Sequence, residues 1–246
     1  KGSYLGPAFT DDAVQSYLDT HRIPYERLNE TERCQRTAEL IAQGNVVGWF
    51  QGRMEFGPRA LGARSILADA RSAEMQSQLN LKIKFRESFR PFAPVVLRED
   101  VQAYFELDRA SPYMLLTAPV RNDRLVKLSN DDQAASGLEK LRVVRSDIPA
   151  VTHVDNSARI QTIEERYHPR FYHLLRAFKE LTGCSVLINT SFNVRGEPIV
   201  CTPHEAYVCF MRTNMDYLVM ESFLLDKKKQ PPWSEDDSWQ SILAQD

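Results

Sequence analysis

The sequence predicts an α+β fold in which one twisted, mixed β-sheet is flanked by helices. Two patterns indicate it: short β-prone apolar runs outnumber the helical segments, and the two kinds of segment mix irregularly along the chain. The composition agrees, because 43% of the 246 residues are hydrophobic and 26% are charged. Such values are typical of a globular chain that is long enough to bury a sizeable core.

Helices are expected first. We predict that residues 1–45 form a helical linker segment, in which Thr10 caps a helix that runs to Leu18 and a second helix covers about residues 31–43. A buried strand over residues 46–50 leads through a glycine-rich loop into the next elements. In chain order these are a strand over 66–69, a helix over 72–83, a strand over 92–97, a helix over 101–107 and a strand over 113–120.

A polar segment over residues 122–146 interrupts this pattern, and we expect a mobile loop or an insertion there. The elements predicted after it are strands over 150–154 and 159–163, an amphipathic helix over 168–182, a strand over 185–188, a helix over 202–211 and a strand over 217–225. We therefore assign residues 46–226 to one domain and residues 227–246 to a polar C-terminal tail.

Charge and cysteine usage argue against several classes of protein. Lys and Arg number 31 against 33 Asp and Glu, and the net charge of −2 disfavours a dedicated nucleic-acid-binding surface. The four cysteines have no C-x-x-C spacing, which favours small core residues over disulfides or a zinc site. Neither a membrane span of roughly 18 apolar residues nor a signal peptide is visible. We expect a cytoplasmic location and, because the sequence does not begin with Met, a processed chain or a segment of a longer one.

The first candidate binding motif is the run Q-G-R-M-E-F-G-P-R-A-L-G-A-R-S over residues 51–65. Glycines recur every five residues and are interleaved with Arg53, Arg59 and Arg64. Glycine lets backbone N–H groups approach an anion, and guanidinium groups grip phosphate oxygens in pairs. The run predicts an anion-binding cradle, although tight turns with solvated arginines explain it equally well. It lacks the Lys-Ser/Thr pair of a Walker A loop.

Two more basic motifs follow. The run L-K-I-K-F-R-E-S-F-R-P-F-A-P over residues 81–94 places Lys84 and Arg90 among phenylalanines and prolines, which favours cations held by a core over a solvated charged face. The run T-H-V-D-N-S-A-R-I-Q-T over residues 152–162 places Arg159 between small and apolar neighbours. Such neighbours make an ordinary solvent-exposed position less expected for Arg159 than a position that binds a ligand.

The fourth motif joins a strand end to a helix start, in the run I-N-T-S-F-N-V-R-G-E-P-I-V-C-T-P-H-E over residues 188–205. Ser191 and Asn193 follow the strand, where hydroxyl and amide groups suit a phosphate or a ribose. Polar turn residues alone also have a purely structural explanation. Thr202 and Glu205 form a capping box, which predicts that a helix begins there.

Taken in this order, the four motifs resemble the C-terminal half of the O-carbamoyltransferases that act on nodulation factors and on antibiotics such as tobramycin, novobiocin and cephamycins. The resemblance runs from about residue 4 to residue 226. It implies a YrdC-like fold, similar to the enzymes that make threonylcarbamoyl-adenylate for tRNA modification. It also implies that carbamoyl phosphate and ATP, with Mg²⁺ bound to the substrate, give carbamoyl-adenylate, phosphate and pyrophosphate, without a metal site of the chain's own.

The resemblance implies roles for individual residues. The expected catalytic residues are Lys84, Arg90 and Arg59. The expected substrate- and nucleotide-binding residues are Arg59, Lys84, Arg90, Arg159, Ser191, Asn193 and Thr152. Several preorganised cations stabilise the charge that develops at the α-phosphate while carbamate attacks it, so no general base is required.

Partners are implied as well. Members of this family carry an N-terminal half, related to the Kae1 ATPase-like fold, which transfers the carbamoyl group to a hydroxyl of a small-molecule acceptor. Nothing in these residues supplies that half, so we expect a Kae1-like transfer domain to act in cis or in trans. The expected function is that of the carbamoyl-adenylate-forming domain of an O-carbamoyltransferase, and the alternative is a non-catalytic nucleotide- or RNA-binding YrdC-like module.

Overall fold

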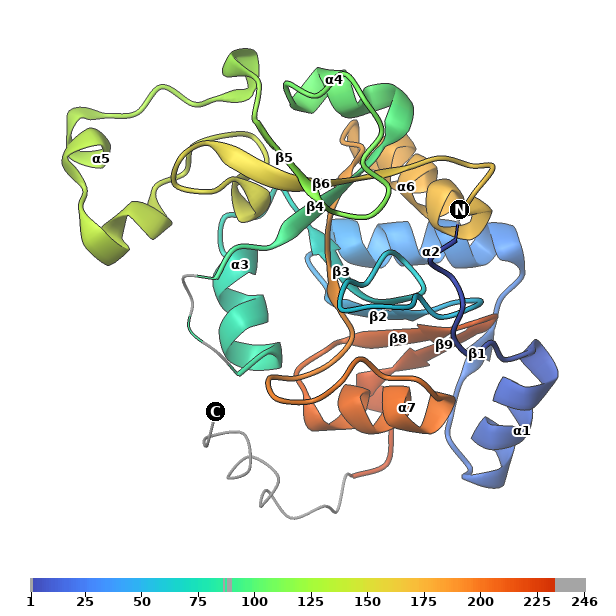
Figure 1. Ribbon diagram of the computed structural model, residues 1–246. Coiled ribbons are helices and arrows are strands. Elements are labelled where there is room, and N and C mark those ends of the chain that lie inside the picture. The colour runs from blue at the N-terminus through green and yellow to red at the C-terminus, as the bar shows by residue number, and fades with distance from the viewer. Residues whose placement is uncertain (1, 86, 88–89, 233–246) are drawn as a thin grey trace.

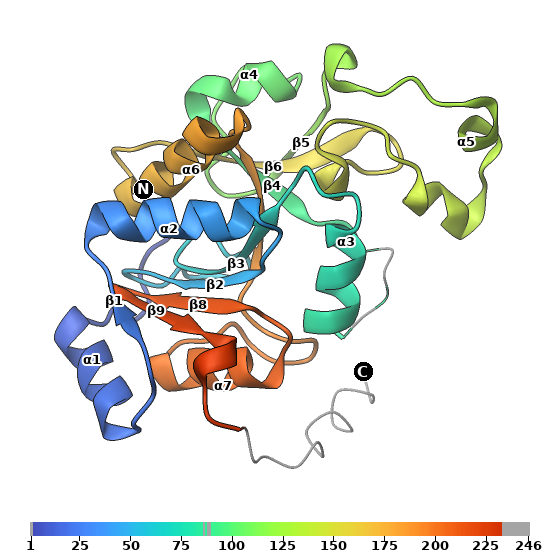
Figure 2. The same ribbon diagram turned by 180° about the vertical axis from the view of Figure 1, so that it is seen from behind.

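The computed structural model describes residues 2–85, 87 and 90–232, which form one nine-stranded mixed sheet with helices on both faces (Figures 1 and 2). The strand order is β1-β9-β8-β2-β3-β7-β4-β6-β5. β2 pairs with β8 and β4 pairs with β6 in parallel, and the other neighbouring strands pair antiparallel. The prediction of an α+β fold with a mixed sheet flanked by helices is confirmed.

The regular elements follow the predicted order closely. The strands are β1 (Glu26–Arg27), β2 (Val47–Phe50), β3 (Arg64–Asp69), β4 (Ala93–Leu97), β5 (Leu116–Pro119), β6 (Ser157–Ile163), β7 (Val186–Ser191), β8 (Tyr217–Met220) and β9 (Phe223–Asp226). The α-helices are α1 (Asp11–Thr20), α2 (Glu30–Ala42), α3 (Met75–Gln78), α4 (Val101–Tyr104), α5 (Asn130–Ala134), α6 (Pro169–Thr182) and α7 (Pro203–Arg212). A π-helical turn, Leu79–Ile83, extends α3 toward β4.

Helices α2 and α6 pack side by side on one face of the sheet, and α7 packs on the other (Figures 1 and 2). Side chains alternate between these faces along each strand. Trp49 points to the α6 side, where its ring lies 6.5 Å from that of Phe171. The preceding position requires glycine, because a Cβ atom on Gly48 would lie 2.8 Å from the ring of Phe192.

The segment that we predicted as a helical linker, residues 1–45, contributes to the same core as the sheet. Its two helices form as expected, and the Thr10 hydroxyl and the Asn29 side chain cap them. Their apolar faces are fully buried in the main cluster, as Leu18 and Ile41 show. In addition, β1 pairs with β9 at the edge of the sheet. Amphipathic helices bury their apolar faces against the nearest sheet, so this segment packs as part of the domain and not as a linker to it.

Two strand predictions were wrong. Residues 150–154 do not form a strand, because the segment Pro149–Val151 makes one 3₁₀ turn that buries Ala150 and Val151 without pairing. The predicted strand over 217–225 is two strands. Glu221 has a φ of 48°, and this left-handed residue reverses the chain between β8 and β9.

The polar segment over residues 122–146 forms an arm that projects from the sheet and carries α5 at its tip (Figure 1). Its base is closed by an ion pair of 2.8 Å between Arg124 and Asp147. The C-terminal tail begins with a 3₁₀ turn, Lys227–Lys229, and residues 233–246 lie outside the described residues. Across the described part of the chain, every helix is too short or too polar to cross a membrane.

Candidate functional site

The predicted site residues gather at one end of the sheet. β2 and β7 end there, and β3, β4 and β6 begin there, because the first two strands run opposite to the other three. The loops at this end therefore bring together motifs that are far apart in the sequence. The predicted residues that the chain places at this end are Arg59, Lys84, Arg90, Thr152, Arg159, Ser191 and Asn193.

Lys84, Ser191 and Asn193 form one hydrogen-bonded cluster. The Lys84 ammonium is 3% exposed and donates to the side-chain and main-chain oxygens of Asn193, each at 2.8 Å. It also donates to the main-chain oxygen of Ser191 and lies 3.4 Å from its hydroxyl. The Ser191 hydroxyl donates in turn to the Asn193 side chain at 2.7 Å. This cluster of a cation, a hydroxyl and an amide offers the groups that bind phosphate oxygens.

Arg159 and Arg59 form the second cluster. Arg159 is half-buried in β6, and burial lowers the pKa of its guanidinium. The positive charge of Arg59 lowers this pKa further. The loop that carries Arg59 also approaches β6 directly, because the Gln161 side chain, two positions after Arg159, binds the Leu61 main-chain oxygen at 2.8 Å. Within the described part of the chain, neither arginine forms an ion pair with a carboxylate. Two adjacent uncompensated cations favour a bound anion.

Two buried amides hold the loop that carries Arg59. The Asn189 side chain, on β7, donates to the Ala60 main-chain oxygen at 3.1 Å and to the Gln161 side chain at 2.6 Å. The Gln161 side chain, on β6, donates to the Leu61 main-chain oxygen at 2.8 Å. Ala93 on β4 pairs with Asn189, and Val95, two positions further along β4, pairs with Gln161. Because residues two positions apart in a strand share a face, both amides point to one face of the sheet. They fix the loop over that face.

The predicted anion cradle over residues 51–65 holds an anion of its own. The Glu55 carboxylate is 3% exposed, and its Oε1 atom accepts the backbone N–H groups of Leu61 and Ala63, each at 2.6 Å, and that of Arg64 at 3.3 Å. Glycine turns do supply converging N–H groups, as the motif suggested. They bind this carboxylate and are therefore not available to an external anion.

The three arginines of this motif have three different positions. Arg59 and Arg53 are exposed, whereas Arg64 is fully buried in β3. The Arg64 guanidinium donates to the main-chain oxygens of Gly52 at 3.1 Å and Ala63 at 2.9 Å and lies 3.5 Å from the Phe50 ring centroid. Burial lowers its pKa to about 10, against the opposing charges of nearby carboxylates. Arg64 is therefore a structural residue of the core.

An ion pair of a buried glutamate anchors the start of the same loop. Glu221, in the turn between β8 and β9, pairs with Arg170 at the start of α6. Its other carboxylate oxygen accepts the backbone N–H of Gly52. The main-chain oxygen of Glu221 accepts from the Gln51 side chain at 2.8 Å and from Arg33 at 3.3 Å. The loop over residues 51–63 is thus held by carboxylates near both of its ends.

Arg90 and Thr152 make other contacts at this end of the sheet. Arg90 is exposed and pairs with Glu87 at 3.1 Å, and Glu87 also lies 3.6 Å from Arg195. Thr152 donates to the Ile148 main-chain oxygen at 2.9 Å and shares a hydrogen bond with the Ser146 hydroxyl. Their predicted roles in substrate binding stay predictions.

Sequence reasoning missed the residues that position these groups. Glu55 stands inside the glycine motif, and Gln161 and Asn189 stand inside the third and fourth motifs, but none is among the predicted site residues. A polar residue at an inward strand position was the available signal for Gln161 and Asn189, because such residues need buried partners. Nothing local marks Glu221 or Arg170, whose partners are distant in the sequence.

Among residues 2–85, 87 and 90–232, no group of three or more His, Cys, Asp or Glu side chains gathers in a way that could hold a metal ion. Divalent cations need several oxygen, nitrogen or sulfur ligands from such groups.

The comparison with protein families gives the identity of this domain. Residues 38–227 match the family described as carbamoyltransferase C-terminus. The chain belongs to this carbamoyltransferase family. The match spans the sheet from β2 to β9 and all four motifs, so the resemblance noted from the sequence is confirmed.

Curated relatives extend beyond this carbamoyltransferase domain. The chain is 58% identical to protein sll1178 of Synechocystis sp. over its full length, which is 40% of that protein. It is 41% identical over 94% of its length to nodulation protein NolNO of Sinorhizobium fredii, of which it spans 32%. It is 42% identical over 80% of its length to the 3'-hydroxymethylcephem-O-carbamoyltransferase of Amycolatopsis lactamdurans, of which it spans 34%. The chain thus covers about a third to two fifths of these relatives.

Among solved structures, a phosphate- and nucleotide-bound form of full-length HypF overlays on 77% of this carbamoyltransferase domain and on 25% of HypF. The TM-score is 0.49 and the sequence identity is 16%. The YrdC-like character of the sheet stays an expectation from the sequence resemblance.

Proposed function

We propose that this chain is the domain of an O-carbamoyltransferase that forms carbamoyl-adenylate from carbamoyl phosphate and ATP. Membership of the carbamoyltransferase family supports the reaction class. The observation that carries the proposal is the gathering, at one end of the sheet, of a lysine–serine–asparagine cluster and of two arginines that pair with no carboxylate among the described residues. Two phosphorylated substrates that react with each other need such cationic groups, held in place before the substrates arrive.

The two clusters have separate tasks in this proposal. Lys84, Ser191 and Asn193 receive the phosphates of ATP, whose oxygens replace some of the protein oxygens that the ammonium contacts. Charge-assisted bonds of this kind are short and strong. Arg59 and Arg159 grip the phosphoryl group of carbamoyl phosphate, because guanidinium groups match phosphate oxygens in bidentate fashion.

The proposed reaction balances in two steps. Water cleaves carbamoyl phosphate, which gives carbamate and inorganic phosphate. A carbamate oxygen then attacks the α-phosphorus of ATP, the bond from that phosphorus to the bridging oxygen breaks, and pyrophosphate leaves. Negative charge builds on the α-phosphate oxygens during the attack, and the Lys84 ammonium stabilises it. The chain itself needs to supply only binding, orientation and positive charge.

The remaining components are also part of the proposal. Mg²⁺ enters as the complex with ATP, where it neutralises phosphate oxygens. The carbamoyl group then passes to a hydroxyl of a small-molecule acceptor on a Kae1-like transfer domain in cis or in trans. The length that the curated relatives have beyond this chain leaves room for such a domain in them.

Calorimetric titration of the purified chain tests the proposal. We expect ATP with Mg²⁺ to bind, carbamoyl phosphate to bind, and pyrophosphate to be released only when both are present. The variant Lys84→Ala tests the separate tasks of the two clusters. In it, ATP binding should weaken strongly while carbamoyl phosphate binding is retained. Pyrophosphate release at equal rates by the wild type and by variants at Lys84 and Arg59 would refute the roles given to these residues.

A further inference from the structure

The turn that carries Arg59 is built around a buried carboxylate. Three backbone donors, the N–H groups of Leu61, Ala63 and Arg64, converge on the same oxygen of Glu55. Converging backbone N–H groups form a concave site for an anion. Here that anion is the Glu55 carboxylate, which belongs to the same loop and stands four residues before Arg59.

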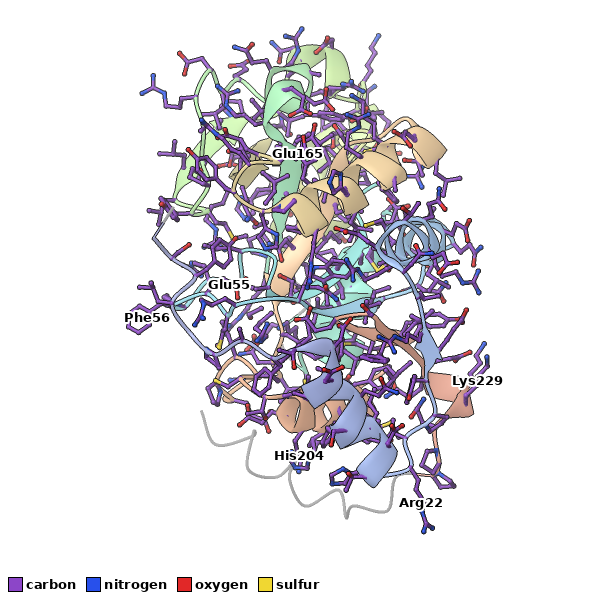
Figure 3. All side chains as sticks on the ribbon, turned by 90° about the vertical axis from the view of Figure 1, so that its right-hand side faces the viewer. Arg22, Glu55, Phe56, Glu165, His204 and Lys229 are labelled. Atoms are coloured by element: carbon purple, nitrogen blue, oxygen red, sulfur yellow. The ribbon has the colours of Figure 1, made fainter. Side chains whose placement is uncertain are left out.

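Glu55 is placed to accept the N–H groups of this turn and not to contact solvent. Its side chain is 3% exposed, and its second oxygen, Oε2, is buried with no hydrogen-bond partner among the described residues. Figure 3 shows the contrast with the next residue, Phe56, which projects from the surface and is 77% exposed. A buried carboxylate with an unsatisfied oxygen destabilises the fold unless it makes compensating contacts. The three N–H groups are those contacts.

Independent contacts fix the far side of the same turn. Gly62 has a φ of 110°, and a Cβ atom there would lie 2.1 Å from the Phe171 ring, so the backbone packs directly on α6. The main-chain oxygens of Ala60 and Leu61 are bound by the buried amides of Asn189 and Gln161. The N–H groups of this turn therefore point to Glu55, while its main-chain oxygens at residues 60 and 61 point to the sheet. Arg59 directly precedes these residues in the loop.

We propose that Glu55 is the positioning residue for Arg59. Its carboxylate collects the N–H groups of the turn and thereby holds Arg59 over the part of β6 that carries Arg159 and Gln161, against the repulsion between the two arginine charges. Without the carboxylate the turn opens, Arg59 moves away from Arg159 and the pair no longer grips one phosphoryl group. This inference rests on the proposed function for the identity of the anion, carbamoyl phosphate, but not for the geometry of the turn.

The sharpest variant is Glu55→Gln, which keeps the shape and one acceptor oxygen and removes the charge. A matched control is Asp216→Asn. The Asp216 carboxylate also accepts a backbone N–H, that of Val46 at 2.8 Å, but it lies at the opposite end of the sheet, where β2 and β8 begin. Glu55→Asp is the second variant, for use if Glu55→Gln does not fold, because it keeps the charge and shortens the reach.

The first measurement is amide hydrogen exchange, which needs no activity. We expect exchange at Leu61 and Ala63 to become at least tenfold faster in Glu55→Gln and to stay within twofold of the wild type in Asp216→Asn. Unchanged exchange at these two amides in Glu55→Gln would overturn the proposal. This outcome is independent of whether the chain uses carbamoyl phosphate.

The second measurement is calorimetric affinity for carbamoyl phosphate and, separately, for ATP with Mg²⁺. We expect Glu55→Gln to weaken carbamoyl phosphate binding at least tenfold and ATP binding less than threefold, a split that general loosening of the fold would not produce. In an Arg59→Ala background, Glu55→Gln should weaken carbamoyl phosphate binding less than twofold further, because it acts through Arg59. Full additivity of the two substitutions would overturn the proposal. If the wild type binds no carbamoyl phosphate, the proposed function fails and the exchange result alone decides about Glu55.

Discussion

The Lys84 ammonium lies 2.8 Å from both oxygens of Asn193, although 109 positions separate the two residues in the chain. Lys84 follows the π-helical turn before β4, and Asn193 follows the end of β7, which is the antiparallel neighbour of β4. The antiparallel pairing of these two strands is what makes the residues neighbours. It creates a cationic, hydrogen-bonded cluster at the end of the sheet where the other predicted site residues lie.

Replacing Lys84 with Ala should weaken ATP binding strongly. A hydrogen bond to a charged group contributes about 1.5–3 kcal/mol, and Lys84 is proposed to contact phosphate oxygens directly, so a loss of roughly tenfold to more than a hundredfold in affinity is expected. The variant also removes the ammonium donor that the two Asn193 oxygens share. Calorimetric titration with ATP and Mg²⁺ measures the effect, with Lys229→Ala, at an exposed lysine, as the control. Wild-type affinity in Lys84→Ala would contradict the assignment.

Arg59→Ala and Arg159→Ala should each weaken carbamoyl phosphate binding by roughly tenfold to a hundredfold, for the same energetic reason. Because both guanidinium groups are proposed to grip one phosphoryl group, the two losses should not add in the double variant. Arg53→Ala is the matched control, since Arg53 is exposed on the same loop and donates to the main-chain oxygen of Gly6. A control variant as impaired as Arg59→Ala would show that the loop's overall charge, and not Arg59, determines binding.

Arg64→Met should destabilise the fold by about 3 kcal/mol or more. The substitution keeps most of the side-chain volume but removes the donors that satisfy the buried main-chain oxygens of Gly52 and Ala63. Arg64→Lys should recover only part of this loss, because one ammonium cannot reproduce a planar fork of donors. Urea unfolding gives the free energy of unfolding for both variants. Stability equal to that of the wild type in Arg64→Met would contradict a structural role.

His168 should make the protein less stable as the pH falls from about 6.5 to about 4. Burial lowers the pKa of its imidazole from 6.5 to about 4, so over this range the unfolded chain binds a proton that the folded chain excludes. The free energy of unfolding should therefore fall by about 3 kcal/mol over this range. This loss is absent above pH 6.5, where the imidazole is neutral in both states.

Unfolding of His168→Phe and of the wild type at several pH values tests this. The difference in free energy of unfolding between the two should change over the stated pH range and stay constant above it. His21→Gln, at an exposed histidine, serves as the control. A difference that does not vary between pH 4 and 6.5 would contradict the expected linkage.

Most of the fold was predictable because its elements carry local signals. Thr10, Asn29 and Thr202 cap helices through their own side chains, and the apolar runs of β2 and β7 are buried along their length. The exceptions depend on distant contacts. The reversal at Glu221 was missed because it is a non-glycine residue with positive φ, and its turn is held by Arg170 and Gly52 from other parts of the chain.

The site was predictable in its residue types and less so in its geometry. Lys84, Ser191 and Asn193 were expected together and are hydrogen-bonded together. Arg59 and Arg64, by contrast, belong to one motif and have opposite environments. Arg64 pairs with Phe50 in the β2–β3 ladder, which turns its side chain into a packed face, whereas Arg59 stands in the loop beyond the ladder. Strand register decides between these positions, and a motif alone does not encode it.

The sequence by itself determined the mixed sheet flanked by helices, the family and the cationic and hydroxyl groups that the site offers, because capping, periodicity and ordered motifs are local properties. Only the tertiary structure decided which of these groups meet. The glycine motif alone does not show which anion its backbone N–H groups bind, and the fold places the Glu55 carboxylate among them. The loop that carries Arg59 reaches β6, which carries Arg159, only because both lie at the same end of the sheet. Long-range contacts of this kind are fixed by packing and pairing, which no local stretch of sequence specifies.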